Sequence, residues 1–288
     1  MAQEKTVAVL GAGGTMGFPM ARNLARSGLS VRAWNRSVEK AQPLADDGAD
    51  VCERAADAVR GADVILTILA DADTVLQTVD GVLDGVDSDT VWLQMSTVGE
   101  TGTERCIEQA RERGIAFVDA PVLGTKQPAE EAKLVILASG PQEQQTGLDP
   151  IFDAVGQRTI WVGEAGSGTK LKLATNSWIL AVVEGAAETL ALAEGLGLDP
   201  SLVLEAVKGG TLDLPYLQMK GRAMLERNFE PSFKLELAAK DAALAQDAAE
   251  RRGLDLPLLA TIRQRFDEGA REHGDQDMSA TYLTSAPR

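Results

Sequence analysis

Short runs of apolar residues recur through the first 165 residues, and helical patterns lie between most of them. The runs show no polar alternation, which is typical of parallel strands that are buried on both faces of a sheet. This rhythm predicts an α/β domain with a doubly wound, mostly parallel sheet over residues 1–165. The expected strands are Thr6–Leu10, Val31–Trp34, Val64–Leu69, Val91–Met95, Ile115–Val118, Leu134–Ala138 and Thr159–Val162, and the helical patterns include Met16–Ser27, Val38–Asp47 and Thr103–Arg113.

The rhythm stops after Gly168. Leu171–Leu196 is one long helical pattern, rich in Ala and Leu and free of proline. Apolar residues surround most of its circumference, so we expect other protein to cover it, including the same helix of a second copy in a homodimer or homotetramer. Residues 166–288 are therefore expected to form an all-helical domain for substrate binding and dimerisation. Its further helices are expected at Pro200–Lys208, Tyr216–Arg227, Leu235–Arg252 and Leu256–Glu272.

Composition narrows the functional classes. The 288 residues suit two globular domains, and the formal net charge of −15 argues against binding to nucleic acid or to an anionic membrane surface. The N-terminus lacks the layout of a signal peptide, no apolar run is long enough to span a membrane, and Cys52 and Cys106 suit a reducing compartment, so we expect a cytoplasmic protein. A single histidine, His273, argues against the usual zinc site and against a Ser-His-Asp hydrolase, and we expect no metal.

A glycine-rich turn directly follows the first expected strand. Strand, glycine turn and helix are the context that a Rossmann-type dinucleotide site requires, because backbone N–H groups can then approach a pyrophosphate at the helix N-terminus. The usual G-x-G-x-x-G spacing fits only if one residue is inserted, with Gly11, Gly14 and Gly17 evenly spaced, and an ordinary strand-to-helix turn is the alternative. The residues expected to contact the cofactor here are Gly11, Gly13, Gly14, Thr15 and Met16.

The second expected strand ends at Asn35, Arg36 and Ser37. An NAD site usually carries Asp or Glu at this point, which bonds the ribose 2′-hydroxyl. Here a 2′-phosphate would meet a guanidinium group and a hydroxyl instead of a carboxylate. We therefore expect NADPH to be preferred over NADH, although Arg36 could also be an ordinary surface arginine.

Further motifs follow in order along the chain. Together with the glycine turn they resemble the β-hydroxyacid dehydrogenase family, which includes 3-hydroxyisobutyrate dehydrogenase, and the Gly-Thr-Lys-x-Pro-Ala stretch looks most like its glyoxylate and succinic semialdehyde reductase branch. The resemblance implies an NAD(P)-dependent oxidoreductase that interconverts a small aldehyde or keto compound and its alcohol. The motifs are Met95-Ser96-Thr97, residues 119–129, residues 168–176, Phe233 with Lys240-Asp241, and the ending at residues 274–280.

Lys172 and Asn176 are the catalytic pair that this resemblance implies. They are four residues apart on the long helix, so both side chains share one face. Reduction of a carbonyl needs a proton at the developing alkoxide, and a buried lysine with a lowered pKa can donate it. Asn176 would hold the substrate oxygen or orient the lysine. The alternative is that Lys170 and Lys172 merely decorate a helix start, where the helix dipole disfavours them; Lys170 is expected at the surface.

The resemblance also implies a substrate loop and contacts around the nicotinamide. Thr97 would lie between nicotinamide and substrate, although a hydroxyl of Ser96 or Thr97 could instead cap the next helix. Leu69 and Ala70 are expected to contact the cofactor. Val122–Thr125 resembles the loop that cradles the substrate carboxylate, with Leu123 in place of the family's serine and with Gly124 and Thr125 beside it. Leucine there puts a short hydroxyacid substrate in doubt.

Three expected site residues come from the helical half. Phe233 and Asp241 match family positions that close the site, and Lys240 resembles a cofactor contact; ordinary core and surface roles are the alternative. Tyr216 and Lys220 fit the Y-x-x-x-K pair of short-chain dehydrogenases but lie among helices without the serine that such a site needs. Imine reduction and a non-catalytic dinucleotide-binding interaction module remain the alternative functions, and Lys172 argues against both.

Overall fold

The apolar runs of the first half form the strands of a six-stranded sheet. The computed structural model describes residues 5–286. Residues 1–4, which belong to the N-terminus where no signal peptide is expected, lie outside the described residues. The strand order is β3-β2-β1-β4-β5-β6, and every neighbouring pair is parallel, as expected. The strands are β1 (Thr6–Leu10), β2 (Ser30–Trp34), β3 (Asp50–Cys52), β4 (Val64–Thr67), β5 (Val91–Gln94) and β6 (Ala116–Asp119).

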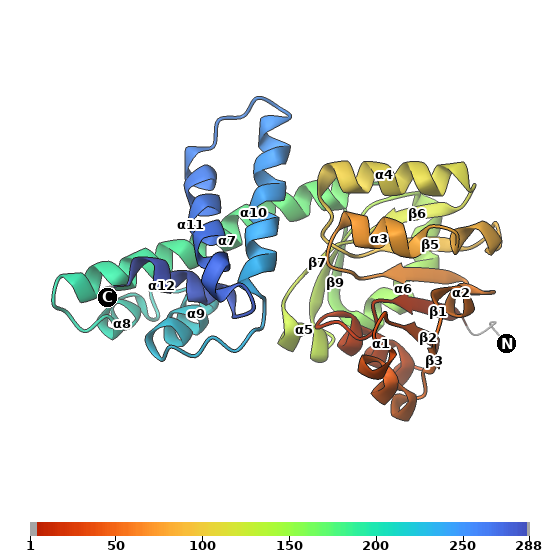
Figure 1. Cartoon of the computed structure of the whole chain (residues 1–288), viewed down its shortest axis with the longest axis horizontal. Coiled ribbons are helices and arrows are strands. Elements are labelled where there is room, and N and C mark those ends of the chain that lie inside the picture. Colours follow the sequence, from red (N-terminus) through yellow and green to blue (C-terminus); the bar gives the residue numbers. More distant parts are fainter. Residues whose placement is uncertain (1–4, 287–288) are drawn as a thin grey trace. The chain divides into compact units, whose positions relative to one another are not determined.

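Helices cover both faces of this sheet (Figure 1). Val7 and Val9 of β1 join one hydrophobic core with residues of α1 (Gly17–Arg26) and α6 (Gln145–Val155). Ala8 and Leu10 of the same strand join a second core on the opposite face. Because alternate residues of one strand are buried in different cores, the strands need no polar face, which confirms the doubly wound arrangement. The second core is completed by α2 (Ala55–Val59), α3 (Ala72–Val79) and α4 (Gly99–Glu112).

A smaller sheet follows β6 in the chain. β7 (Val122–Leu123) is antiparallel to β8 (Leu134–Ala138), and β8 is parallel to β9 (Gly156–Trp161). The short helix α5 (Lys126–Glu130) connects β7 to β8. An isolated bridge between Asp119 and Ser139 links the end of β6 to the end of β8.

Two local expectations differ from the structure. The helix expected at Val38–Asp47 is wrong in type, because this stretch forms two 3₁₀ helices, η1 (Val38–Lys40) and η2 (Gln42–Asp47). Pro43 has no N–H to continue an α-helical ladder across this stretch. The strands β3 and β7 were not expected, since neither contains an apolar run long enough to stand out. Single turns of 3₁₀ helix also occur at η3 (Leu83–Gly85) and η4 (Gln142–Gln144).

The chain divides into two compact units, of which the first ends at Lys172 and the second begins at Leu173. The long helix α7 (Ser167–Gly195) crosses this point and begins four residues before the expected start, inside the Gly/Ser-rich residues 163–168. Residues 173–286 of the second unit form helices and no strand, apart from an isolated bridge between Lys234 and Asp277. The helices are the rest of α7, α8 (Ser201–Val207), α9 (Pro215–Leu225), α10 (Leu235–Glu250), α11 (Pro257–His273), η5 (Met278–Thr281) and α12 (Tyr282–Ser285).

The core of the second unit is built from α7, α10 and α11. Leu180, Val183 and Leu190 of α7 pack in one cluster with Ala238 of α10 and Phe266 of α11. α10 and α11 lie side by side as a helical pair joined by a loop (Figure 1). Within residues 5–286, no helix combines the length and the apolar character that crossing a membrane would require.

Candidate active site

The strands of the large sheet end in register along one edge. Leu10 pairs with both Trp34 and Thr67, Thr67 pairs with Gln94, and Gln94 pairs with Asp119. The residues that follow these strand ends therefore lie next to one another along the carboxyl edge of the sheet. Open α/β sheets bind their ligands at this edge.

The glycine turn between β1 and α1 is tightly packed on one side and exposed on the other. Gly11 has a φ of +104°, and a Cβ atom there would collide with the backbone oxygen of Ile68. A Cβ atom at Gly17 would collide with the oxygen of Gly11. Gly14 and Thr15 are exposed just before α1 begins, and Met16 at its N-cap is half-buried. The turn can thus bring backbone N–H groups and the positive end of a helix to a pyrophosphate, so its geometry fits a dinucleotide.

Asn35 explains the irregular glycine spacing. Its Oδ1 accepts the backbone N–H of Gly13 at 3.2 Å, and its Nδ2 donates to the oxygen of Ser37 at 2.9 Å. A Cβ atom at Gly13 would lie 2.7 Å from the Asn35 Cγ. The additional glycine is therefore required where Asn35 packs against the turn.

The exposed Arg36 and the half-buried Ser37 follow Asn35 at the same edge. Sequence reasoning missed Lys40, whose Cβ lies close to Gly13 and whose side chain is exposed. The sequence did show a second cation, Lys40, four residues after Arg36. The helical pattern expected there gave no reason to place Lys40 beside the glycine turn.

A buried polar network fixes the ends of β4 and β5. The Ser96 hydroxyl accepts the N–H of Leu69 at 2.8 Å, so Ser96 holds the neighbouring loop and does not cap α4, whose N-cap residue is Val98. The Gln94 side chain accepts the N–H of Ser96 at 2.7 Å and donates to the Ser96 oxygen at 2.8 Å. These bonds set the spacing between the segment 69–70 and Thr97. Leu69 and Thr97 are half-buried, and Ala70 is exposed.

Lys172 is buried, with only 8% of its surface exposed, and its ammonium Nζ donates to the backbone oxygen of Val122 at 2.7 Å. The following residue, Leu123, is half-buried in β7. Lys126 and Lys170 are exposed, as expected. The structure thus brings the expected lysine to the expected substrate loop. In that loop Gly124 is exposed with a φ of +129°, and Thr125 is half-buried.

The second unit holds the other expected residues. The Asn176 Nδ2 donates to the Asp241 Oδ2 at 2.7 Å, and the Lys240 Nζ lies 3.1 Å from the Asp241 Oδ1. A carboxylate only accepts hydrogen bonds, so the amide of Asn176 must turn its NH₂ towards Asp241 and its oxygen away from that carboxylate. Phe233 is half-buried and packs against the core of this unit.

Tyr216 and Lys220 do not form a catalytic pair of the short-chain dehydrogenase kind, although their spacing fits one. The Lys220 ammonium is buried, donates to both carboxylate oxygens of Asp277 at 2.7 and 2.9 Å, and lies 5.5 Å from the centre of the Tyr216 ring. The Tyr216 hydroxyl contacts the sulfur of Met278. Both side chains are thus used within the helical core.

The remaining candidates for chemistry are the buried Cys106, the single histidine and possible metal ligands. Burial, assisted by the charge of Asp119, raises the pKa of the Cys106 thiol to about 12, so this cysteine is no nucleophile near neutral pH. His273 is half-buried at the end of α11. Residues 5–286 contain no group of three His, Cys, Asp or Glu side chains that could hold a metal ion.

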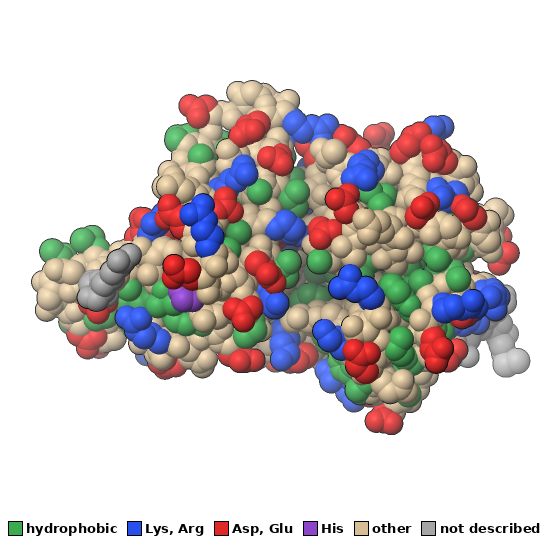
Figure 2. Space-filling view, in the orientation of Figure 1, with side chains coloured by type: hydrophobic (Ala, Val, Ile, Leu, Met, Phe, Trp, Pro, Cys, Tyr) green, Lys and Arg blue, Asp and Glu red, His purple; other side chains and the backbone are tan. Residues whose placement is uncertain are grey.

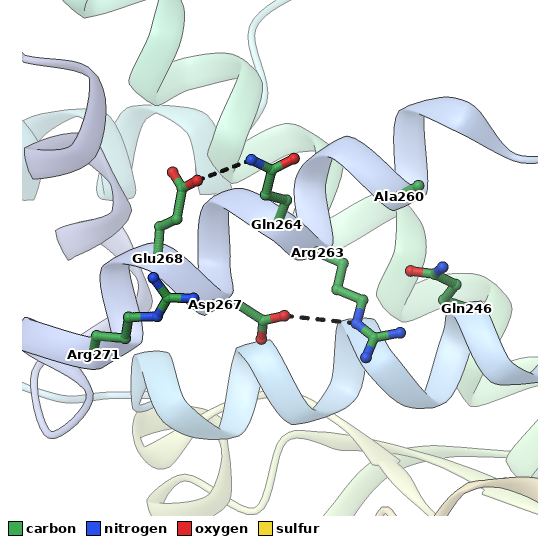
Figure 3. A pocket seen from close by; sticks show the side chains of 7 residues that line it. All are labelled: Gln246, Ala260, Arg263, Gln264, Asp267, Glu268 and Arg271. Carbon is green, nitrogen blue, oxygen red and sulfur yellow. Dashed lines mark hydrogen bonds and ion pairs between the residues drawn. The ribbon is translucent and has the colours of Figure 1, made fainter.

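A shallow depression of about 300 Å³ lies over α10 and α11 (Figure 3). Arg263 pairs with Asp267 at 3.6 Å, and Gln264 donates to Glu268 at 2.9 Å. None of the expected site residues lines it. We assign it no part in the chemistry.

Two family models match consecutive parts of the chain. The NAD-binding domain of 6-phosphogluconate dehydrogenase matches residues 6–163. The NAD-binding domain of NADP-dependent 3-hydroxyisobutyrate dehydrogenase matches residues 166–284. The two matches leave few residues of the chain outside them.

Known proteins are similar over nearly the whole length. Glyoxylate/succinic semialdehyde reductase 1 of Arabidopsis thaliana is 32% identical, with 93% of this chain and 94% of that protein covered. The 3-sulfolactaldehyde reductase of Escherichia coli is 30% identical, with 93% and 91% covered. A solved structure of Mycobacterium tuberculosis 3-hydroxyisobutyrate dehydrogenase with L-serine has a TM-score of 0.88 and 28% identity, with 98% of this chain and 99% of that chain covered.

Proposed function

Because this chain belongs to the β-hydroxyacid dehydrogenase family of NAD(P)-dependent oxidoreductases, we propose that it is an NADPH-dependent reductase of a small aldehyde or ketone, with Lys172 as the proton donor. The observation that carries the proposal is the buried ammonium of Lys172, held at the start of β7 by its 2.7 Å bond to Val122. No histidine lies in the part of the chain that carries the glycine turn and this lysine.

Lys172 has the donors that the reaction needs. The reduced nicotinamide supplies a hydride when bound, and the alkoxide that develops must receive a proton. An ammonium group has three N–H donors, so it can bond the Val122 oxygen and a substrate oxygen at the same time. The Val122 bond also limits the directions in which the long lysine side chain can point. Lys172 would then hold the substrate oxygen by a charge-assisted hydrogen bond and transfer the proton along it.

We propose that Asn176 acts through its carbonyl oxygen. Asp241 engages its NH₂, and the oxygen can only accept. It can therefore accept from the Lys172 ammonium or from the hydroxyl of the alcohol product, but it cannot donate to the substrate carbonyl. This favours orientation of the lysine over direct polarisation of the substrate. Thr97, Phe233 and Asp241 remain proposed substrate contacts, and Leu69, Ala70 and Lys240 proposed cofactor contacts.

The proposed preference for NADPH is supported by the residues after β2. Arg36 and Lys40 are exposed cations on the segment that packs against the glycine turn, and Ser37 adds a hydroxyl. A 2′-phosphate carries negative charge and strong acceptor oxygens, which suit a guanidinium group and an ammonium group. The neutral Asn35 contributes no carboxylate to repel it.

The proposed substrate is larger or less polar than glyoxylate. Leu123 follows Val122, the residue whose oxygen holds Lys172, and it offers no hydrogen bond to a carboxylate. Its bulk would also exclude water from a carboxylate that entered there, which carries a cost. The neighbouring Lys126 is exposed, so its ammonium can remain hydrated in solvent.

The experiment that tests the proposal is a panel assay of NADPH oxidation. It compares glyoxylate, succinic semialdehyde, uncharged aldehydes and ketones, and a cyclic imine. Turnover of an uncharged aldehyde above that of glyoxylate is the expected result. Turnover of the imine alone would contradict carbonyl chemistry, and NADPH binding without any turnover would favour a non-catalytic module.

We also propose that two copies of the chain associate through the second unit. Trp178 and Leu192 of α7 are each 63% exposed, and further exposed leucines continue from its end into α8. Hydrophobic side chains are visible at the end of the second unit where α7 meets α8, and others lie among the charged groups elsewhere on the face in view (Figure 2). Exposed apolar surface on a helical unit favours a symmetric contact with the same surface of a second copy. The residues are Trp178, Leu192, Leu196, Leu198, Leu202, Leu212 and Met219.

A further inference from the structure

A buried carboxylate fastens the first turn of α7 to the end of β6. Asp119, the last residue of β6, is fully buried. Its Oδ2 accepts the backbone N–H of Thr169 at 2.7 Å, and its Oδ1 accepts the Thr169 hydroxyl at 2.8 Å. A negative group at a helix N-terminus satisfies donors that the helix leaves free and is stabilised by the helix dipole.

Ser139 reinforces this attachment from β8. Its hydroxyl lies 3.3 Å from the Asp119 Oδ2 and accepts the N–H of Gly168 at 2.9 Å. The backbones of Asp119 and Ser139 exchange two further hydrogen bonds, at 2.9 and 2.8 Å. A Cβ atom at Gly168 would collide with the oxygen of Leu137, so the helix start has no room to shift towards the sheet. The first turn of α7 is thus fixed against the ends of β6 and β8.

The same short segment also holds Lys172. Lys172 follows Thr169 by three residues on α7, so the two side chains lie on one face of the helix. Its Nζ bonds the oxygen of Val122, which follows Asp119 by three residues in the chain. Residues 119–122 therefore bond α7 at two points. The Asp119 carboxylate accepts from Thr169, and the Val122 carbonyl oxygen accepts from Lys172.

We propose that Asp119 is a positioning residue for Lys172, which fixes the first turns of α7 so that the ammonium stays at Val122. This inference rests on the proposed function, in which Lys172 donates the proton. Asp119 itself touches neither substrate nor cofactor in this proposal. It acts through its bonds to Thr169.

The charge of Asp119 is present at the pH at which the lysine must be protonated. Burial raises the pKa of Asp119 to about 6, although the bonds from Thr169 and Ser139 oppose that increase. The carboxyl is therefore ionised above pH 7. The Cys106 thiol on α4 faces it and stays protonated in that range. The hydroxyls around it on α4, β8 and α7 do not titrate.

Asp119→Asn is the first test. The amide cannot accept both the N–H and the hydroxyl of Thr169 as the carboxylate does, and it carries no charge. We expect kcat to fall by about 10-fold or more, because a small misplacement of a reacting group is costly, with the KM for NADPH unchanged.

The position of the Lys172 ammonium can be probed without catalysis. The rate at which a small amine-reactive reagent labels Lys172, followed by peptide mass spectrometry, is measured against pH. Asp119→Asn should raise the labelling curve, because the ammonium is then held less firmly at Val122.

Hydroxyl variants supply the matched controls if Asp119→Asn folds poorly. Thr169→Val removes one bond to the carboxylate and should lower kcat, whereas Thr169→Ser keeps that hydroxyl and should restore it. Thr103→Val removes an equally buried hydroxyl that contacts Thr169 at 3.0 Å and Gly99 at 2.9 Å, and it should leave kcat and the labelling curve unchanged.

The outcomes separate the inference from the proposed function. If the Asp119 and Thr169 variants leave kcat and the labelling curve of Lys172 unchanged, as is expected of Thr103→Val, the positioning role is wrong. If the curve moves as expected but Lys172→Ala retains activity, the positioning role stands and the proposed proton donor is wrong.

Discussion

The side chain of Asn35 accepts the backbone N–H of Gly13 at 3.2 Å and so joins the end of β2 to the glycine turn after β1. Its amide nitrogen donates to the oxygen of Ser37 at 2.9 Å. A carboxylate could make the first bond but not the second, because it has no hydrogen to donate. A neutral amide at position 35 is therefore needed for both hydrogen bonds, and it also leaves no carboxylate to repel a cofactor 2′-phosphate.

Cofactor preference is the first prediction. The unmodified enzyme should have a kcat/KM at least about tenfold higher with NADPH than with NADH, which corresponds to about 1.4 kcal/mol. Arg36→Ala should narrow this ratio mainly by raising the KM for NADPH. Asn35→Asp should narrow it further, since the new carboxylate would repel the 2′-phosphate and face the oxygen of Ser37. Steady-state kinetics with both cofactors measure the ratio.

Arg111→Ala is a suitable control for these variants. Arg111 is exposed and bonds Glu108 near the C-terminal end of α4, and its loss should leave the ratio unchanged. Equal use of both cofactors by the unmodified enzyme would refute the proposed preference.

Lys172→Ala tests the proton donor. We expect kcat to fall by about 10²- to 10⁴-fold, the usual contribution of a positioned acid or base, while the Kd for NADPH hardly changes. Lys170→Ala removes an exposed ammonium two residues away and should keep nearly full activity. A Lys172→Ala enzyme with half the original kcat would remove this residue from the mechanism.

Leu123→Ser tests the substrate preference. The new hydroxyl should bond a carboxylate, and such a bond to a charged group is worth about 1.5–3 kcal/mol. At the lower end of that range, kcat/KM for glyoxylate should rise about tenfold. The informative quantity is the ratio of glyoxylate to an uncharged aldehyde in both enzymes. An unchanged ratio would mean that residue 123 does not face the substrate carboxylate.

The buried Lys220–Asp277 pair predicts how stability depends on pH. Burial would by itself raise the pKa of Asp277, but the Lys220 charge and the bonds from Lys220 and Ser279 outweigh it and lower the pKa to about 2. Because the pKa of Asp277 is lower in the folded protein than its ordinary value of 3.8, the ionised carboxylate stabilises the fold at pH values above 3.8. That stabilisation is lost as the pH falls towards 2. Its size is about 2 kcal/mol.

Lys220→Met leaves the Asp277 carboxylate buried without its cation. It should cost about 3–5 kcal/mol of unfolding free energy at pH 7. Without Lys220, burial raises the pKa of Asp277, so the difference between variant and unmodified protein should shrink as the pH falls from 4 to 2. Urea unfolding at several pH values measures it. Lys133→Met, which breaks the exposed pair with Glu131, should cost no more than about 1 kcal/mol. A pH-independent difference for Lys220→Met would contradict the assignment.

Association of two copies predicts a particle of twice the 30.5 kDa chain mass in light scattering at micromolar concentration. Leu192→Glu and Leu196→Glu place a carboxylate in the apolar surface of the second unit and should shift the particle towards the single chain. Gln142→Glu, exposed on the first unit, should not. A 30.5 kDa particle from the unmodified chain would reject the contact.

The sequence by itself determined the class of fold and the outline of the candidate site. Unbroken apolar runs such as Thr6–Leu10 can be buried only between two layers of helices, and the structure gives that strand the predicted bounds. The glycine turn and the long helix were readable for the same reason, because each depends on residues that are close in the chain. Lys172 and Asn176 could be named together since helical periodicity alone puts them on one face.

Only the tertiary structure decided which distant residues meet. Nothing local in the sequence pairs Asn35 with Gly13, Asp119 with Thr169, or Lys220 with Asp277, and these pairs are separated by 22, 50 and 57 positions. Such contacts form because strand register and helix packing bring their segments together, and burial then requires each polar group to find a partner. The strand β3 and the 3₁₀ turns after β2 likewise owe their form to the sheet edge and to Pro43 and not to periodicity, which is why the apolar pattern did not predict them.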